Sequence, residues 1–394
     1  MATRACRIRI LSLLLPVGLC GCSETLFIFG DRLGDLSDGI DTIEQCVSPL
    51  EPADLGEVFA GAVPVNWNGD TAQLSDDTHQ TVADYYAGQL SSEVLPAYYL
   101  NERIFHLGSM TSGDRLEVEI LSDVVSDVWF YDSGLTFAGG RAHDLDGNRI
   151  MLTFPINSEN PDCFLRFNFF YLSNTGKPIA HITRTQGTSP GEPRGQTVVL
   201  NFAGWSQLTF RSGSLKPTDV GPTENAIVRA AVVQTFRETF AGYNVVVLSS
   251  DDPPPAQPYS IIHIGPADPR IGTLGQAEHI DFQNAVPDDV AVVDTNHRAL
   301  SAASLLGPEV LGAALGKVAA HEMGHLLGLH HVSDPNELMT GAGCQGVGLD
   351  PLAMLNRQFA RAPVSSFTND FFVGYQDAPA ILRDIVGISA TDTP

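Results

Sequence analysis

The stretch His321-Glu322-Met323-Gly324-His325-Leu326-Leu327-Gly328-Leu329-His330-His331 ends a long apolar run and decides which fold is expected around it. Residues four apart lie on one face of a helix, so His321 and His325 can present two imidazoles to one metal ion. Glu322 lies about 100° round the helix, within reach of a water at that metal. Gly328 stands where the chain must turn, because a left-handed turn is cheap only for glycine. His331 can then return as a third nitrogen ligand, which leaves zinc an open fourth position for catalysis.

The sequence from residue 197 onward alternates strand and helix patterns. Thr197–Phe202 is a run typical of a buried strand, and Glu224–Phe240 carries apolar residues at the spacing of one helical face. Pro308 and Glu309 open the helix that carries the histidines, which is expected to run to Leu327. Further strands are expected at 243–248, 259–264 and 289–294, and a closing helix at 369–385. This order predicts an α/β (α+β) domain over residues 197–394.

Between residues 102 and 185 the pattern changes to short strands. Arg115–Ile120 alternates polar and apolar residues, and similar runs follow at 127–132, 149–154, 164–171 and 179–183. Strands at this spacing predict an all-β sandwich, and the pattern loosely resembles the bacterial pre-peptidase modules of secreted proteases. Residues 186–196, rich in Gly, Pro, Ser and Thr, predict a linker. Residues 22–101 have a weak pattern and predict an irregular N-terminal segment with some helix. The chain is therefore expected to be multidomain.

The first 21 residues predict a targeting segment. Three arginines precede a nearly apolar run, Ile8–Leu19, that is too short to span a bilayer. It ends in Leu19-Cys20-Gly21-Cys22, which resembles the cleavage box of bacterial lipoproteins, although Cys20 departs from the pattern. The resemblance implies a signal peptide over residues 1–21, a lipid on Cys22 and attachment to the outer membrane, since Ser23 and not Asp follows. Ordinary secretion is the alternative.

The charge balance bears on partners and metals. The chain has 22 Lys and Arg against 46 Asp and Glu, a formal net charge of −24, so it repels phosphate backbones and excludes nucleic acid as a partner. Solubility outside the cell explains the acidity, with calcium binding as the second interpretation. Asp144–Asn148 has the composition of a calcium loop but is interpreted first as a hairpin turn. His279, which precedes Asp281, is interpreted as an ordinary structural or surface histidine.

The use of the six cysteines is consistent with an exported protein. Cys6 and Cys20 leave with the signal segment and Cys22 would carry the lipid. The remaining three suffice for one disulfide and one odd thiol: Cys46, Cys163 and Cys344. The sequence leaves the pairing open, and a role for Cys46 as a latency switch has no motif to support it.

His321, Glu322, His325, Gly328 and His331 together form the extended zinc signature of the metzincin metalloproteases. A methionine, Met339, follows eight residues later, a spacing similar to the matrixin branch, in which a methionine turn lies beneath the histidines. The resemblance implies one catalytic Zn²⁺ on the three histidines, with Glu322 as general base for metal-activated water. The tyrosine that follows the methionine in other branches is absent, and so is the matrixin structural-zinc loop, which leaves a second zinc open.

The function expected from these features is a zinc-dependent endopeptidase acting on proteins or peptides outside the inner membrane. Two alternatives stay open. One is an envelope lipoprotein that binds a surface ligand and holds a structural metal, although a structural site has no need of Glu322 as a base. The other is an amidase acting on cell-wall peptides. Substrate preference and oligomeric state do not follow from the sequence.

Overall fold

The computed structural model describes residues 59, 61–75, 102–122, 125–132, 137–141, 151–155, 160–169, 177–187, 193–202, 209–211, 217–219, 222–266, 273–281, 284, 286–341, 351–364 and 374–389. The predictions for the signal peptide, Cys22, Cys46, Cys344 and Asp144–Asn148 lie outside these residues. They stay predictions, as do the domain boundaries. Within the described ranges, no helix is both long and apolar enough to cross a membrane.

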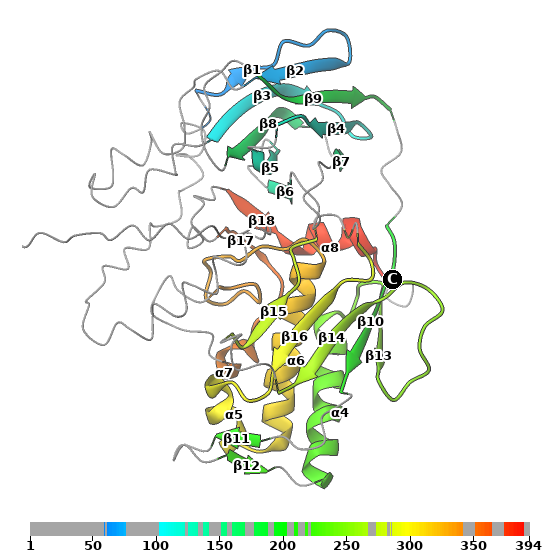
Figure 1. Cartoon of the computed structure of the whole chain (residues 1–394), viewed down its shortest axis with the longest axis vertical. Helices are drawn as coiled ribbons and strands as arrows, with labels where there is room; N and C mark the ends of the chain where they lie inside the picture. The colour runs from blue at the N-terminus through cyan, green and yellow to red at the C-terminus, as the bar shows by residue number, and fades with distance from the viewer. Residues whose placement is uncertain are drawn as a thin grey trace, which may run out of the picture.

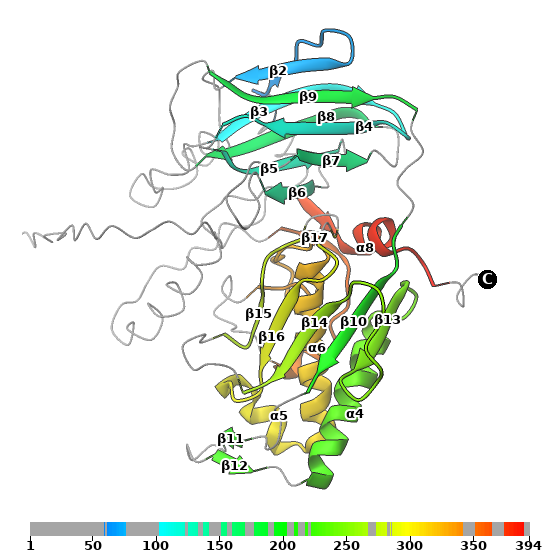
Figure 2. The same cartoon turned by 45° about the vertical axis from the view of Figure 1, so that its right-hand side comes forward.

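The N-terminal half of the described chain is built from two sheets, drawn at the top of Figures 1 and 2. In β4, Leu116, Val118 and Ile120 are buried at alternate positions, as expected for a strand with one covered face. Both sheets contribute to a single buried apolar cluster, so two layers enclose one core. The strands, in sheet order, are β1 (Val63–Pro64), β3 (Glu102–Met110), β8 (Asn160–Phe169), β5 (Val125–Tyr131) and β6 (Phe137–Arg141), and then β2 (Thr71–Ser75), β9 (Pro178–Thr185), β4 (Arg115–Ile120) and β7 (Met151–Pro155).

Strands β1 and β2 come from the segment predicted to be irregular. Val63 and Pro64 pair with β3, and residues 71–75 pair with β9 along its length. Local sequence shows no strand signal here because the partners lie far along the chain, and pairing on a half-buried sheet can override propensity. The described part of residues 22–101 therefore extends both sheets.

The remaining half is a mixed α/β fold around a five-stranded sheet, coloured green to yellow in Figures 1 and 2. Four strands run parallel, and only β15 runs antiparallel to its neighbour β16. Two long helices, α4 (Pro222–Thr239) and α6 (Pro308–Leu326), share the apolar core of this half with the sheet. The strands, in sheet order, are β13 (Val245–Ser249), β10 (Gln196–Asn201), β14 (Ser260–Gly265), β16 (Val290–Asp294) and β15 (Gly275–Ala277).

Smaller elements complete this half. One difference from the sequence prediction concerns the closing helix, expected from residue 369. The described helix α8 begins only at Ala378, after strand β18, because Asp377 caps it by accepting a hydrogen bond from Ala380 N at 3.0 Å and Pro379 lies in its first turn. The other elements are β11 (Thr209–Arg211), β12 (Pro217–Asp219), η3 (Arg298–Leu300), α5 (Ser301–Leu305), α7 (Pro351–Met354), β17 (Arg361–Pro363), β18 (Tyr375–Asp377) and α8 (Ala378–Val386).

Glycines let α4 and α6 approach closely. A Cβ at Gly312 would overlap the carbonyl oxygen of Val228 and lie 2.6 Å from Ala231 Cβ. A Cβ at Gly316 would lie 2.8 Å from the carbonyl oxygen of Val232. Because backbone atoms cannot yield as a flexible side chain can, this contact fixes how α6 lies on the core.

Gly312→Ala is therefore expected to destabilise the protein. Alanine in an exposed helix normally gains about 1 kcal/mol over glycine, but overpacking costs about 1–3 kcal/mol. The free energy of unfolding measured in urea should fall, and Gly265→Ala serves as the control because nothing lies within 4 Å of the added Cβ. Equal effects of the two substitutions would contradict the role assigned to Gly312.

Candidate metal centre

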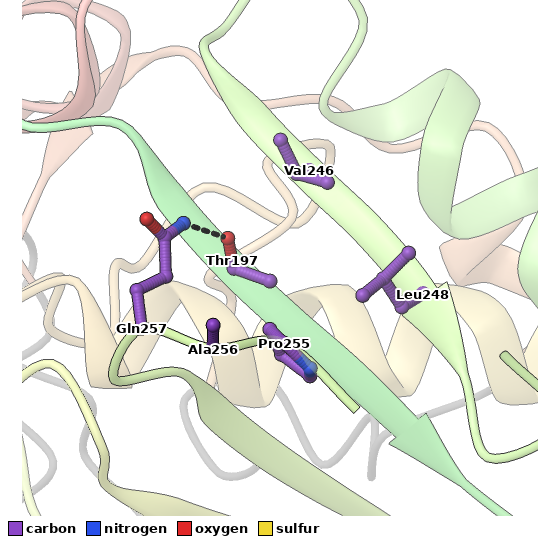
Figure 3. Close-up of a pocket in the computed structure, with 6 residues that line it drawn as sticks. All are labelled: Thr197, Val246, Leu248, Pro255, Ala256 and Gln257. Carbon is purple, nitrogen blue, oxygen red and sulfur yellow. Dashed lines mark hydrogen bonds between the residues drawn. The ribbon is translucent and has the colours of Figure 1, made fainter. Parts of the chain in front are cut away.

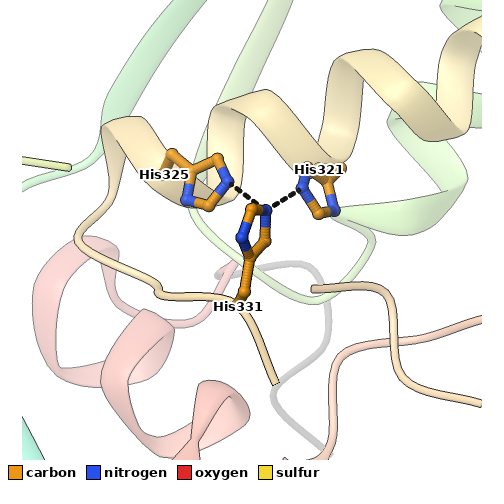
Figure 4. Close-up of side chains that lie close together, drawn as sticks. All are labelled: His321, His325 and His331. Atoms are coloured by element: carbon orange, nitrogen blue, oxygen red, sulfur yellow. Dashed lines mark hydrogen bonds between the residues drawn. The ribbon is translucent and has the colours of Figure 1, made fainter. Parts of the chain in front are cut away.

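Three imidazoles meet at the C-terminal end of α6. His321 and His325 lie on successive turns of the helix, and His331 returns to them from the following loop, as Figure 4 shows. The His331 Nε2 atom is 3.2 Å from the Nε2 atoms of both His321 and His325. Nitrogen atoms bound tetrahedrally to zinc at 2.0–2.1 Å are about 3.3 Å apart. The three residues thus fit a zinc ion and form a group that could hold a metal.

Hydrogen bonds to the backbone settle which nitrogens face the metal position. The Nδ1–H of His321 donates to the carbonyl of Leu338 at 2.8 Å, and that of His325 to the carbonyl of Leu329 at 2.7 Å. Since a carbonyl can only accept, the proton of each neutral ring is on Nδ1 and the Nε2 lone pair points inward. Backbone carbonyls that accept from the second ring nitrogen commonly orient histidine ligands in metal sites.

The rings are also neutral. Burial lowers the pKa of His321 to about 4 and that of His331 to about 3. Burial lowers the pKa of His325 well below its usual range as well. Metal ligation requires the unprotonated ring, so at neutral pH no proton has to be displaced from the site.

Gly328 makes the turn that returns the chain to the site. Its φ is 82°, in the left-handed region. Gly328 N donates to the carbonyl of His325 at 2.9 Å, and Leu329 N reaches back to that of Gly324 at 2.9 Å, so the helix ends in a closed turn. This turn places Leu329 as the acceptor for His325 and lets His331 face the helix.

Met339 lies fully buried against the helix. A Cβ at Gly324 would overlap its Sδ atom, so the methionine side chain rests on the helix backbone between the two histidine ligands. The turn around it is held by Glu337, which is 1% exposed and whose carboxylate accepts hydrogen bonds from Met339 N and from Ala360 N. Burial raises the pKa of Glu337 to about 7. Glu337 was not singled out from the sequence, although it stands two residues before Met339.

Glu322 is buried beside the first histidine and faces strand β15. A Cβ at Gly275 would overlap the Oε1 atom of Glu322 and lie 2.7 Å from its Cδ atom. The backbone of β15 therefore lies directly against the carboxylate. Nothing local in the sequence marks Gly275, because the strand is only three residues long and reaches the site by pairing with β16.

Gly275→Ala is expected to displace the Glu322 carboxylate, because the three atoms nearest to the added Cβ all belong to that side chain. The sequence predicts Glu322 to be the general base, and misplacing such a group by about 1 Å costs about 10²-fold in rate, so kcat for the predicted peptide hydrolysis should fall by that order while zinc content stays unchanged. Gln276→Ala is the control, because neighbouring side chains of a strand point to opposite faces. An unchanged kcat with bound zinc would refute this placement of Glu322.

His330, which precedes the third histidine of the group, contacts two distant parts of the chain. Its backbone N–H donates to Gln376 Oε1 at 2.7 Å, and its carbonyl accepts from Gln376 Nε2 at 2.9 Å. Gln376 is fully buried on β18. On the other side, the His330 ring lies edge-on to Trp129 of β5, with ring centroids 4.8 Å apart. His330 is thus held by strand β18 near the C-terminus and by strand β5 of the N-terminal half.

A separate hollow lies far across the sheet from this centre. It has a volume of about 380 Å³ and is lined by β10, β13 and the loop at 255–257, as Figure 3 shows. Strand β13 is at the edge of the sheet opposite to β15. The hollow therefore takes no part in the chemistry at the histidines.

Comparison with known proteins gives one family. The matrixin family model matches residues 273–343, which include β15, the three histidines and Met339. No curated protein matches the chain.

Solved structures give distant likenesses. Archaemetzincin from Methanopyrus kandleri is 15% identical, with 50% of this chain and 97% of that chain covered at a TM-score of 0.26. An active-site mutant of a family two carbohydrate esterase from Clostridium thermocellum is 7% identical, with 42% and 58% covered at a TM-score of 0.15. Both TM-scores are below 0.5, so neither establishes a shared fold. The matrixin match, together with the histidine group, supports a metzincin-type zinc metallopeptidase.

Proposed function

We propose that this chain is a zinc-dependent endopeptidase that hydrolyses peptide bonds of extracytoplasmic proteins, with Glu322 as its general base. The observation that carries the proposal is the convergence of three Nε2 atoms at the end of α6, where Glu322, the residue after the first histidine, is buried with its carboxylate against β15. His321, His325 and His331 would hold the zinc. When bound, zinc supplies a Lewis acid that polarises the scissile carbonyl and makes water acidic enough to deprotonate near neutral pH.

The protein groups then have distinct tasks. Glu322 takes the proton of the attacking water and passes it to the departing amine, as general acid–base catalysis requires. The carbonyls of Leu338 and Leu329 keep two imidazoles in the ligating tautomer throughout. Met339, held by Glu337, gives the histidines a rigid apolar floor.

The position of strand β15 favours a peptide as the substrate. It ends the described sheet and lies against Glu322, so an extended chain could pair with its outer edge beside the base. Addition of a strand to a sheet edge is a common way to bind extended peptides without demanding a particular sequence. The segment after Met339 would then shape the preference for side chains.

Mapping of cleavage sites on an unfolded protein tests the proposal. Zinc-loaded protein is expected to cut internal peptide bonds, and a chelator should stop the cleavage until zinc is restored. Full zinc occupancy without cleavage of any peptide in a broad library would favour a ligand-binding lipoprotein. Release of fragments only from purified cell wall would favour an amidase.

We also propose that a lipid on Cys22 anchors the protein to the outer membrane. Cys22→Ala is expected to abolish incorporation of labelled fatty acid and to release the protein from membranes. Cys20→Ala is the matched control and should keep the label. If the label is lost only in Cys20→Ala, or in neither variant, the anchor is wrongly assigned.

A further inference from the structure

A second group of metal-ligating side chains lies beyond β15, outside the histidine centre. His279, Asp281 and Asp289 each offer one ligand atom, and these atoms lie within 4.8 Å of one another. All three residues are buried, with exposed fractions of 5%, 4% and 2%. The ordinary structural or surface role predicted for His279 is incomplete, since its place in the fold brings it to two buried carboxylates.

Hydrogen bonds with the backbone hold Asp281 in place. Asp281 N donates to the carbonyl of His325 at 3.0 Å, and Asp281 Oδ2 accepts from Val286 N at 2.8 Å. Asn284 N donates to the carbonyl of Asp281 at 3.0 Å, and Asn284 has a φ of 51°, in the left-handed region. Non-glycine residues hold that conformation where surrounding contacts determine it. Asp281 and Asn284 are therefore held beside each other by the backbone.

Asp289 supplies an independent observation that points to a ligand. Its Oδ1 atom accepts a hydrogen bond from Ser260 Oγ at 2.7 Å, but its buried Oδ2 atom has no hydrogen-bond partner among the described residues. The Oδ1 atom of Asn284 is buried without a hydrogen-bond partner as well. Buried polar atoms without partners are rare because desolvation is costly, and a bound ion is one way in which such atoms are satisfied.

Charge gives the same indication. The Asp281 and Asp289 carboxylates are buried close together, where two negative charges repel each other unless a cation compensates them. A divalent cation would remove the repulsion and supply the partner that Asp289 Oδ2 lacks.

We propose that His279, Asp281 and Asp289 hold a second divalent transition-metal cation, of the class of zinc, with a structural role. One imidazole nitrogen with two carboxylate oxygens suits zinc better than calcium, which takes six to eight oxygen ligands. The Asn284 amide oxygen, which lies on the same loop, is the candidate for a fourth ligand. A closed set of protein ligands is the arrangement of a structural site rather than a catalytic one.

The position of this cation would link three elements around the catalytic centre. His279 follows the end of β15, Asp289 precedes β16, and Asp281 is bonded to the carbonyl of His325 on α6. The cation would therefore fix the strand that lies against Glu322 to the helix that carries Glu322. Its loss should loosen β15 without removing any ligand of the catalytic metal.

Metal stoichiometry of the full chain tests the proposal without using activity. Apo-protein reloaded with Zn²⁺ and freed of excess metal is expected to hold two equivalents by mass spectrometry. His325→Ala and Asp289→Asn should each hold one equivalent, and the double variant none. One equivalent in the unchanged chain and in Asp289→Asn, with none in His325→Ala, would overturn the second site. One equivalent in His325→Ala, lost in the double variant, would support it even if no peptide were ever cleaved.

Cobalt distinguishes loss of metal from loss of folding. His325→Ala loaded with Co²⁺ is expected to show visible absorption bands that His279→Gln in the same background removes, while far-ultraviolet circular dichroism stays unchanged. Zn²⁺ should raise the Tm of His325→Ala. It should not raise the Tm of the double variant His325→Ala, Asp289→Asn, because a metal stabilises only a native state that binds it. Absorption bands that persist after His279→Gln is added, together with a Tm shift that persists after Asp289→Asn is added, would place the ion elsewhere.

Discussion

Glu322→Gln is expected to lower kcat for peptide cleavage by about 10²–10⁴-fold, the range contributed by a positioned general base. Glutamine keeps the length and shape of the side chain but cannot accept a proton at neutral pH. The three Nε2 atoms and the backbone carbonyls that orient their rings are untouched, so zinc content should equal that of the unchanged protein. Because α6 keeps its core contacts, Tm should change little.

The matched control is Glu309→Gln. Glu309 lies exposed in the first turn of the same helix, and the same chemical change there should leave kcat as it was. Steady-state kinetics on an unfolded protein substrate, with zinc measured on the same samples, reports both quantities. Turnover that survives in Glu322→Gln with full zinc occupancy would remove Glu322 from the mechanism.

His331→Ala is expected to abolish metal binding at the histidine centre, and with it cleavage. Changes to groups that only orient a ligand typically cost about 10–100-fold in metal affinity, so loss of one of three ligands should cost more than about 100-fold. His331 Nε2 is 3.2 Å from each of the other two ligand atoms, which makes it a full member of the group. Competition with a chromophoric chelator gives the affinity directly.

His330→Ala makes a sharp control because the two histidines are adjacent in the sequence. The His330 ring contacts Trp129, while its backbone, which the substitution retains, carries the bonds to Gln376. Loss of an aromatic contact costs about 0.5–1.5 kcal/mol of stability and no metal ligand. Zinc kept at the histidine centre in His331→Ala but lost from that centre in His330→Ala would reverse the assignment of the third ligand.

The part of the site that could be predicted from the sequence is the part encoded locally. His321 and His325 are one helical turn apart, and Gly328 and His331 follow within six residues of the second ligand, so helix geometry and one glycine turn define them. The longer elements of the α/β half could be predicted for the same reason, since each is a run with its own pattern: β10, β13, β14, β16, α4 and α6.

The rest depends on contacts between distant segments. Gln376 and His330 are 46 residues apart, and Trp129 reaches His330 from the other half of the chain. Gly275 is placed against Glu322 by the pairing of β15 with β16, and β15 is too short to show a period of its own. Asp289 reads as the start of an ordinary strand, and only the packed structure shows that its carboxylate lies close to His279 and Asp281.

The contact between Trp129 and His330 has a consequence for how such proteins can be recombined. A C-terminal region cut out at the predicted linker would retain His321, Glu322, His325 and His331, yet it would lose the Trp129 ring that contacts His330. If the N-terminal half were replaced by that of another protein, the replacement would need an aromatic residue at the position of Trp129 to contact His330 in the same way. The two halves are therefore compatible as a matched pair, and grafting either one onto a foreign partner should need a compensating residue at position 129 or 330.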